Sequence, residues 1–200
     1  MRILASIPFE QVLRDFLKDH PHVMEGVDDE DNTNDDAEEN LCLAQLALGG
    51  WQHVALDRAE VLDVVLPWHM GEYGEHELIP PAGMTVAAAA ARLRELGEPY
   101  LRGNPRCAAK LAHHERAPMG PVYLSTRPVP GPDYERLEAV AGLIHLDGLH
   151  RLLAWERAGR LDGDVAVEAY LAVEGVAPAA RSAAGLEEDV RRVRRAVRSS

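Results

Sequence analysis

The sequence predicts an α/β (α+β) protein in which helices pack on a small mixed sheet. Near the C-terminus, residues 141–173 have the pattern of a strand, a helix and a second strand. Upstream, helical patterns with N-cap residues alternate with short apolar runs. The 200 residues are 46% hydrophobic and 27% charged, which is ordinary globular composition.

The first segment, residues 1–60, is expected to form a helical extension with an acidic loop. Apolar residues at helical spacing predict an amphipathic helix over 9–16 and a second helix over 38–48. The acid-rich stretch 25–39 is interpreted as a solvated loop whose last acids lie at the N-terminus of the second helix, because it lacks the fixed Gly and Glu spacing of a calcium loop. The run 51–56 predicts a short strand.

The core is expected to span residues 61–175, and a separate helix is expected over 182–200. Thr85 and Asn104 stand at the N-cap positions of two predicted helices, and Pro and Gly in 67–81 indicate a loop. The predicted core strands are 61–66, 122–126, 141–146 and 165–173, and the predicted helices are 85–97, 105–115 and 149–159.

Charge and cysteine content restrict the classes of partner. The formal net charge is −12, so extensive binding to nucleic-acid phosphates is not expected. No apolar run approaches the ~20 residues of a membrane-spanning helix, and no signal peptide is evident. Cys42 and Cys107 are too few for a disulfide framework and are expected to pack as small apolar residues. A reduced, cytoplasmic protein is expected.

The main candidate for a functional site is the turn from Asp147 to Arg151, where a predicted strand passes into a helix. The first N–H groups of a helix have no partner within it, so they can bind phosphate. Gly148 permits a close approach of the backbone at Leu149, and His150 and Arg151 add donors. In the alternative interpretation Asp147 caps the helix, and Arg151 pairs with Glu156 or faces solvent.

The segment LIHLDGLHRLLAWERAG resembles the signature turn of the ParB/sulfiredoxin-like superfamily, and its Asp-Gly-x-His-Arg pattern is closest to the branch that phosphorylates free serine. GPVYLSTRP resembles the strand before that turn, and GEHELIPP resembles a loop with a His-Glu pair, here His76 and Glu77. Sulfiredoxins carry a catalytic Cys where this chain has Leu149, so their chemistry is not expected. The Gly-Glu-Arg-Arg motif of chromosome-partitioning members is also absent. The resemblance covers residues 61–173.

This resemblance implies a small-molecule kinase that uses ATP or ADP with Mg²⁺. Glu77 would contact the hydroxyl of an amino-acid acceptor, with His76 beside it and Asp147 near it. The turn from Gly148 to Arg151 would bind the nucleotide phosphates. Loss of the Arg151 side chain is expected to weaken nucleotide binding with little effect on folding.

Other interpretations remain open. The chain could be a nucleotide-binding regulatory or partner-binding protein without turnover, and residues 1–60 could supply substrate specificity or a homodimer contact. Glu72 and Glu75 compete with Glu77 as the catalytic base. A zinc site at His69 and His76 is not expected, because their spacing has no regular ligand geometry and neither an HExxH motif nor a Cys partner is present.

Overall fold

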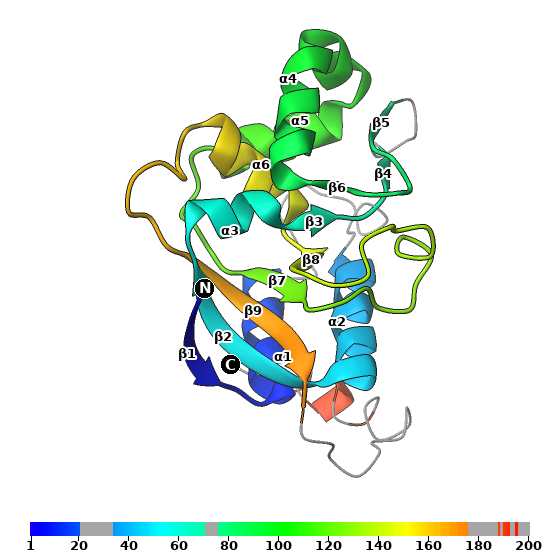
Figure 1. Cartoon of the computed structure of the whole chain (residues 1–200), viewed down its shortest axis with the longest axis vertical. Coiled ribbons are helices and arrows are strands. Elements are labelled where there is room, and N and C mark those ends of the chain that lie inside the picture. The colour runs from blue at the N-terminus through cyan, green and yellow to red at the C-terminus, as the bar shows by residue number, and fades with distance from the viewer. Residues whose placement is uncertain (21–33, 71–75, 176–187, 189, 193–194, 196–200) are drawn as a thin grey trace.

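The structure is a computed structural model that describes residues 1–20, 34–70, 76–175, 188, 190–192 and 195. Figure 1 shows a central sheet with helices packed around it. The elements in chain order are β1 (Arg2–Ser6), α1 (Phe9–Asp19), α2 (Asn34–Leu48), β2 (Gly49–Leu56), α3 (Arg58–Asp63), β3 (Val65–Leu66), β4 (His69–Met70), β5 (Glu77–Ile79), β6 (Met84–Thr85), α4 (Val86–Gly103), α5 (Pro105–His114), β7 (Val122–Ser125), β8 (Ile144–Asp147), α6 (Leu149–Arg157) and β9 (Val167–Glu174).

The main sheet is mixed, which confirms the predicted α+β class. Its seven strands in the described part of the chain have the order β1-β2-β9-β7-β8-β3-β6. The pairs β7–β9 and β3–β8 are parallel, and the other pairs are antiparallel. Strands β4 and β5 form a separate two-stranded sheet. Because β8 lies between β7 and β3, the turn from β8 into α6 starts at an interior strand of the main sheet.

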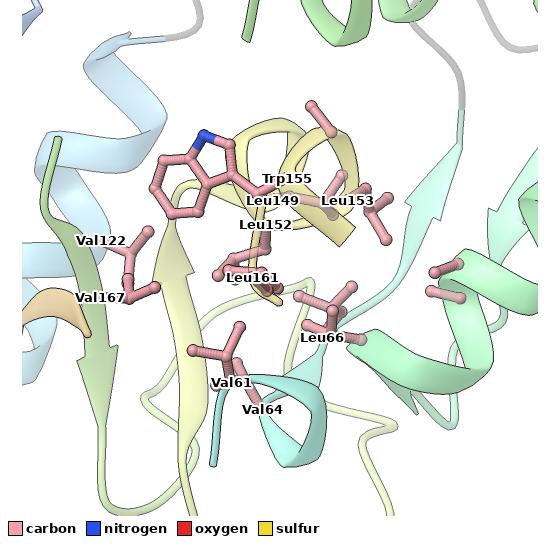
Figure 2. Packing of buried hydrophobic residues seen from close by; sticks show 14 of the residues in the cluster. Val61, Val64, Leu66, Val122, Leu149, Leu152, Leu153, Trp155, Leu161 and Val167 are labelled. Carbon is pink, nitrogen blue, oxygen red and sulfur yellow. The ribbon is translucent and has the colours of Figure 1, made fainter. Parts of the chain in front are cut away.

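Both faces of the sheet are covered by helices, so the protein has two hydrophobic cores. Along β7, Val122 and Leu124 contribute to the core with α3, α4, α5 and α6, whereas Tyr123 contributes to the core with α1 and α2. This is the alternation of side chains expected along a strand buried on both faces. Figure 2 shows the side chains of α6 over Val122 and Val167.

Most predicted core elements are confirmed, but the strand predicted over 61–66 is wrong. Asp57 caps a helix over Arg58–Asp63, because its side chain accepts from the Glu60 N–H and the Glu60 side chain accepts from the Asp57 N–H. This capping box starts α3, and only Val65–Leu66 remain as a strand.

The helix predicted over 85–97 continues further than expected. The Thr85 hydroxyl caps α4 as predicted, accepting from the Ala88 N–H at 3.2 Å. Gly97 then takes a φ of 55° and interrupts the helix, and a second helical segment runs to Gly103. Asn104 stands at the N-cap of α5 as predicted, although its side chain donates back to the Tyr100 carbonyl at 3.0 Å.

The N-terminal 60 residues are more than a helical extension, since they also supply β1 and β2 to the main sheet. Strand β2 pairs with β9 along its whole length. Residues 34–39 of the acidic stretch belong to α2, where Glu38 is buried, so the interpretation of this part as a solvated loop is wrong. Residues 25–33 and most of the helix predicted over 182–200 lie outside the described residues. Among the described residues, no helix has the length and apolarity needed to cross a membrane.

Candidate functional site

The predicted turn lies at the carboxyl end of β8, where the chain passes from Asp147 through Gly148 into α6. Gly148 is the N-cap residue and has a φ of 108°, which disfavours residues with a side chain. A Cβ at this position would also lie 2.8 Å from Cγ1 of Val122. The sequence requires glycine here because the turn passes directly over β7.

The side chain of Arg151 is folded beneath this turn. It is 8% exposed, its Nη1 donates to the Pro121 carbonyl at 2.6 Å, and its Nη2 donates to Oδ2 of Asp147 in an ion pair. Arg151 therefore pairs with Asp147, whereas Glu156 pairs with Arg58 of α3 at 2.9 Å. Asp147 does not cap α6. The expectation that Arg151 contributes little to folding conflicts with this burial.

His20, which the sequence analysis did not select, completes this ion pair. It is the C-cap residue of α1, and its ring stacks on Phe16 with centroids 4.3 Å apart. Nδ1 lies 3.0 Å from the Phe16 carbonyl oxygen, and Nε2 lies 3.1 Å from Nη2 of Arg151. Nε2 also lies 3.3 Å from Oδ2 of Asp147.

The ionisation of Asp147 is governed by these neighbours. Burial alone would raise its pKa, but the Arg151 guanidinium and the His20 ring hold the pKa well below its usual range. Asp147 is therefore a carboxylate at neutral pH. Because Arg151 and His20 both contact Oδ2, Oδ1 is the oxygen of Asp147 that could hold a cation.

A second group of side chains lies beside the turn. Within the described residues, His69 of β4, Cys107 of α5 and His150 of α6 have possible ligand atoms that all lie within 4.8 Å of one another. The Cys107 sulfur is 3.6 Å from Nε2 of His69, and the rings of His69 and His150 meet edge to face with centroids 5.3 Å apart. Burial, followed by the fields of His69 and Lys110, lowers the pKa of His150.

Glu77 and His76 lie in a different place, at a hollow of about 350 Å³ that Arg92 and Tyr100 also line. Oε2 of Glu77 accepts from the Trp68 indole at 3.2 Å, and Oε1 lies 3.9 Å from Nη2 of Arg92. Figure 1 shows β5, which carries Glu77, at the upper right of the molecule and β8 near its middle. No hydrogen bond or ion pair joins Glu77 to Asp147 in the part of the chain that the structure describes.

The structure thus brings together Asp147, Gly148 and Arg151, and it brings His76 together with Glu77. It does not join the two sets. Sequence reasoning missed His20 and the pairing of His69 with Cys107. Both depend on contacts between elements distant in the chain, and no local spacing indicates them.

The fold and site define an α+β protein with a glycine turn and a buried ion pair at the centre of a mixed sheet. Residues 1–189 match a family described as a family of unknown function (DUF6309), and the chain belongs to that family. No curated protein and no solved structure matches the chain.

Proposed function

We propose that this protein is a small-molecule kinase that transfers a phosphoryl group from ATP or ADP to the hydroxyl of a serine-like amino acid. The observation that carries the proposal is the turn at Gly148. It places the first N–H groups of α6 at the carboxyl end of a central strand, which is where α/β proteins commonly bind phosphates. The ParB/sulfiredoxin-like resemblance of this turn supports the same assignment.

In this proposal the backbone N–H groups from Leu149 to Arg151 hold the phosphates. Gly148 lets the turn that carries these groups pass close to β7, since a Cβ there would meet Val122. Arg151 acts at short range beneath the turn, where it fixes Asp147 and adds positive charge.

Mg²⁺ would bind at Oδ1 of Asp147, where it would offset charge on the transferred phosphoryl group. Glu77 would accept the proton of the acceptor hydroxyl at the hollow lined by His76 and Arg92. Catalysis by such a site is mainly positioning and charge neutralisation. The proposal therefore requires that the acceptor at the hollow and the nucleotide at the turn lie close enough to react with each other.

A second candidate is a nucleotide-binding regulatory or partner-binding protein without turnover. The separation of Glu77 from Asp147 favours it, because phosphoryl transfer needs the base and the phosphate site at one reacting centre. Binding alone needs only the turn.

The test is a screen of ATP and ADP against a panel of free amino acids and hydroxylated metabolites with Mg²⁺. Phosphorylated product is measured by mass spectrometry, and nucleotide binding by calorimetry. Product from at least one acceptor is expected. Nucleotide binding without product from any acceptor would favour the regulatory protein, and the absence of nucleotide binding would reject both candidates.

A further inference from the structure

The side chains of His69, Cys107 and His150 form a group that the kinase proposal does not use as a unit. His69 comes from the two-stranded sheet, and Cys107 and His150 come from the first turns of α5 and α6. These two helices pack against each other. Cys107 is 1% exposed and is not part of a disulfide. Two imidazoles and a thiol are the donor types that zinc-class transition metals prefer, whereas Mg²⁺ prefers oxygen.

The separations of these atoms suit a common metal ion. In a tetrahedral zinc site, with Zn–N near 2.0 Å and Zn–S near 2.3 Å, neighbouring ligand atoms lie about 3.3 to 3.5 Å apart. The Cys107 sulfur and Nε2 of His69 are already 3.6 Å apart. All the ligand atoms lie within 4.8 Å of one another, so side-chain rotations that move these atoms by about 1 Å would bring them to the separations of a tetrahedral site.

An independent observation also points to a ligand at His150. Nε2 of its ring is buried and has no hydrogen-bond partner in the described part of the chain. A buried polar atom without a partner costs about 1–3 kcal/mol, so such atoms often mark a place where a ligand or ion belongs. Nε2 is one of the two atoms through which this imidazole can bind a metal.

The local charges permit a cation. Cys107 lies in the first turn of α5, where the positive end of the helix dipole favours a thiolate. That thiolate would offset the positive field of Lys110, which acts on the neighbouring His150. Imidazoles bind metal ions in their neutral form, so His69 and His150 would add no charge to such a site.

We propose that His69, Cys107 and His150 bind one zinc-class metal ion, with water at the fourth position. Three protein ligands and an exchangeable water are typical of reactive rather than purely structural zinc sites. The inference goes beyond the proposed kinase function and assigns the His150 imidazole to the metal. The backbone of the same turn remains available for phosphate.

The full-length protein, freed of metal with a chelator, is titrated with Co²⁺, and Zn²⁺ affinity is measured by competition with a chromophoric chelator. One equivalent of Co²⁺ should give visible bands typical of four-coordinate cobalt and a thiolate-to-cobalt charge-transfer band. Because the chain has only two cysteines, Cys42→Ser isolates Cys107 as the single thiol. The charge-transfer band should persist in Cys42→Ser and disappear in Cys107→Ser.

Substitution of either histidine should weaken Zn²⁺ binding by at least about tenfold, since loss of even an outer-shell partner has an effect of that size. His69→Gln and His150→Gln are compared with His53→Gln, which alters a histidine on β2 that pairs with Glu168. If a histidine variant does not fold, X-ray absorption of zinc-loaded Cys42→Ser should show one sulfur ligand together with imidazole ligands.

Three results would each overturn the proposal. The first is a folded wild-type protein that binds no stoichiometric Co²⁺. The second is a charge-transfer band that is lost in Cys42→Ser and kept in Cys107→Ser. The third is wild-type Zn²⁺ affinity in both His69→Gln and His150→Gln. None of these measurements uses kinase activity, so failure of the metal site and failure of the proposed function are distinguishable.

Discussion

Nε2 of His20 lies 3.3 Å from Oδ2 of Asp147, which joins the end of the first helix to the turn at the end of β8. Arg151 donates to Asp147, and its Nη2 also lies 3.1 Å from Nε2 of His20. The N-terminal segment therefore contributes a side chain to the contacts around the turn between β8 and α6. A deletion that removed α1 would expose a carboxylate and a guanidinium that the fold now keeps largely from water.

The first prediction concerns Arg151. Arg151→Ala should lower the free energy of unfolding by about 3–5 kcal/mol, because it leaves the buried Asp147 carboxylate and the Pro121 carbonyl without their donor. Arg157→Ala is the matched control, since Arg157 lies on the same helix in a more exposed pair with Glu115 and should change stability by ~1 kcal/mol or less. Urea unfolding measures both. Equal midpoints for Arg151→Ala and wild type would contradict the structural role of the guanidinium.

The second prediction concerns Gly148. Gly148→Ala should destabilise the protein by about 1–3 kcal/mol through its positive φ, with a further cost from the contact with Val122. Gly142→Ala is the control, because Gly142 has a φ of 124° but a Cβ there would meet nothing within 4 Å. Thermal unfolding should therefore show the larger loss at Gly148. Equal losses would mean that the Val122 contact has no energetic effect.

The third prediction concerns acid stability. Burial lowers the pKa of His145 to about 4, so the unfolded chain takes up a proton near pH 6.5 while the folded protein does not. Stability should fall as the pH drops from 6.5 to 4 and show no further loss from this group below that value. His145→Leu should reduce this fall by on the order of 1–3 kcal/mol, measured as urea unfolding at a series of pH values.

His114, whose pKa burial also lowers to about 4, acts in the same direction and remains in the His145→Leu variant. The slope should therefore decrease without vanishing. An unchanged pH profile in His145→Leu would show that this ring does not contribute.

The fourth prediction tests Glu77 as the base of the proposed kinase. Glu77→Gln should lower turnover by ~10²–10⁴ while nucleotide binding stays nearly normal. Folding should survive, because the Gln carbonyl can still accept from Trp68. Glu95→Gln, an exposed carboxylate on α4, is the control. Rates are measured on the acceptor found in the nucleotide screen.

Glu72→Gln and Glu75→Gln are assayed in parallel, because these two residues are close to Glu77 in sequence and lie outside the described residues. If one of them loses turnover while Glu77→Gln keeps it, the assignment of the base is wrong and the kinase proposal stands. If all three variants keep the wild-type rate, none of these three carboxylates is the base, and Asp147 is the remaining acid of the proposed site.

Local signals predicted the local structure well. The turn from Asp147 to Arg151, the caps at Thr85 and Asn104 and the strand 122–125 all follow from neighbouring residues. The strand predicted over 61–66 was wrong, although the sequence contained a signal for the helix found there. Asp57 and Glu60 have the spacing of a capping box. An apolar run alone does not distinguish a short buried helix from a strand.

The partners within the site were less predictable. Burial of Arg151 depends on α1 and on the Pro121 carbonyl, and neither is close to it in sequence. Likewise, Cys107 meets His69 only because α5 packs beside α6 and β4 brings His69 against both helices. Such contacts are properties of the tertiary structure, so residue type and spacing could not specify them.

The position of β9 between β2 and β7 has a consequence for how the chain assembles during synthesis. Residues 167–174 form the last of the described strands to be made, yet they join the antiparallel β1–β2 pair to the remaining strands. Until they leave the ribosome, the two parts of the sheet have unpaired edges, and the pairing that closes them is of long sequence separation. A nascent chain that stops before residue 167 should therefore be protease-sensitive and prone to aggregate, and compaction should come abruptly with the last strand.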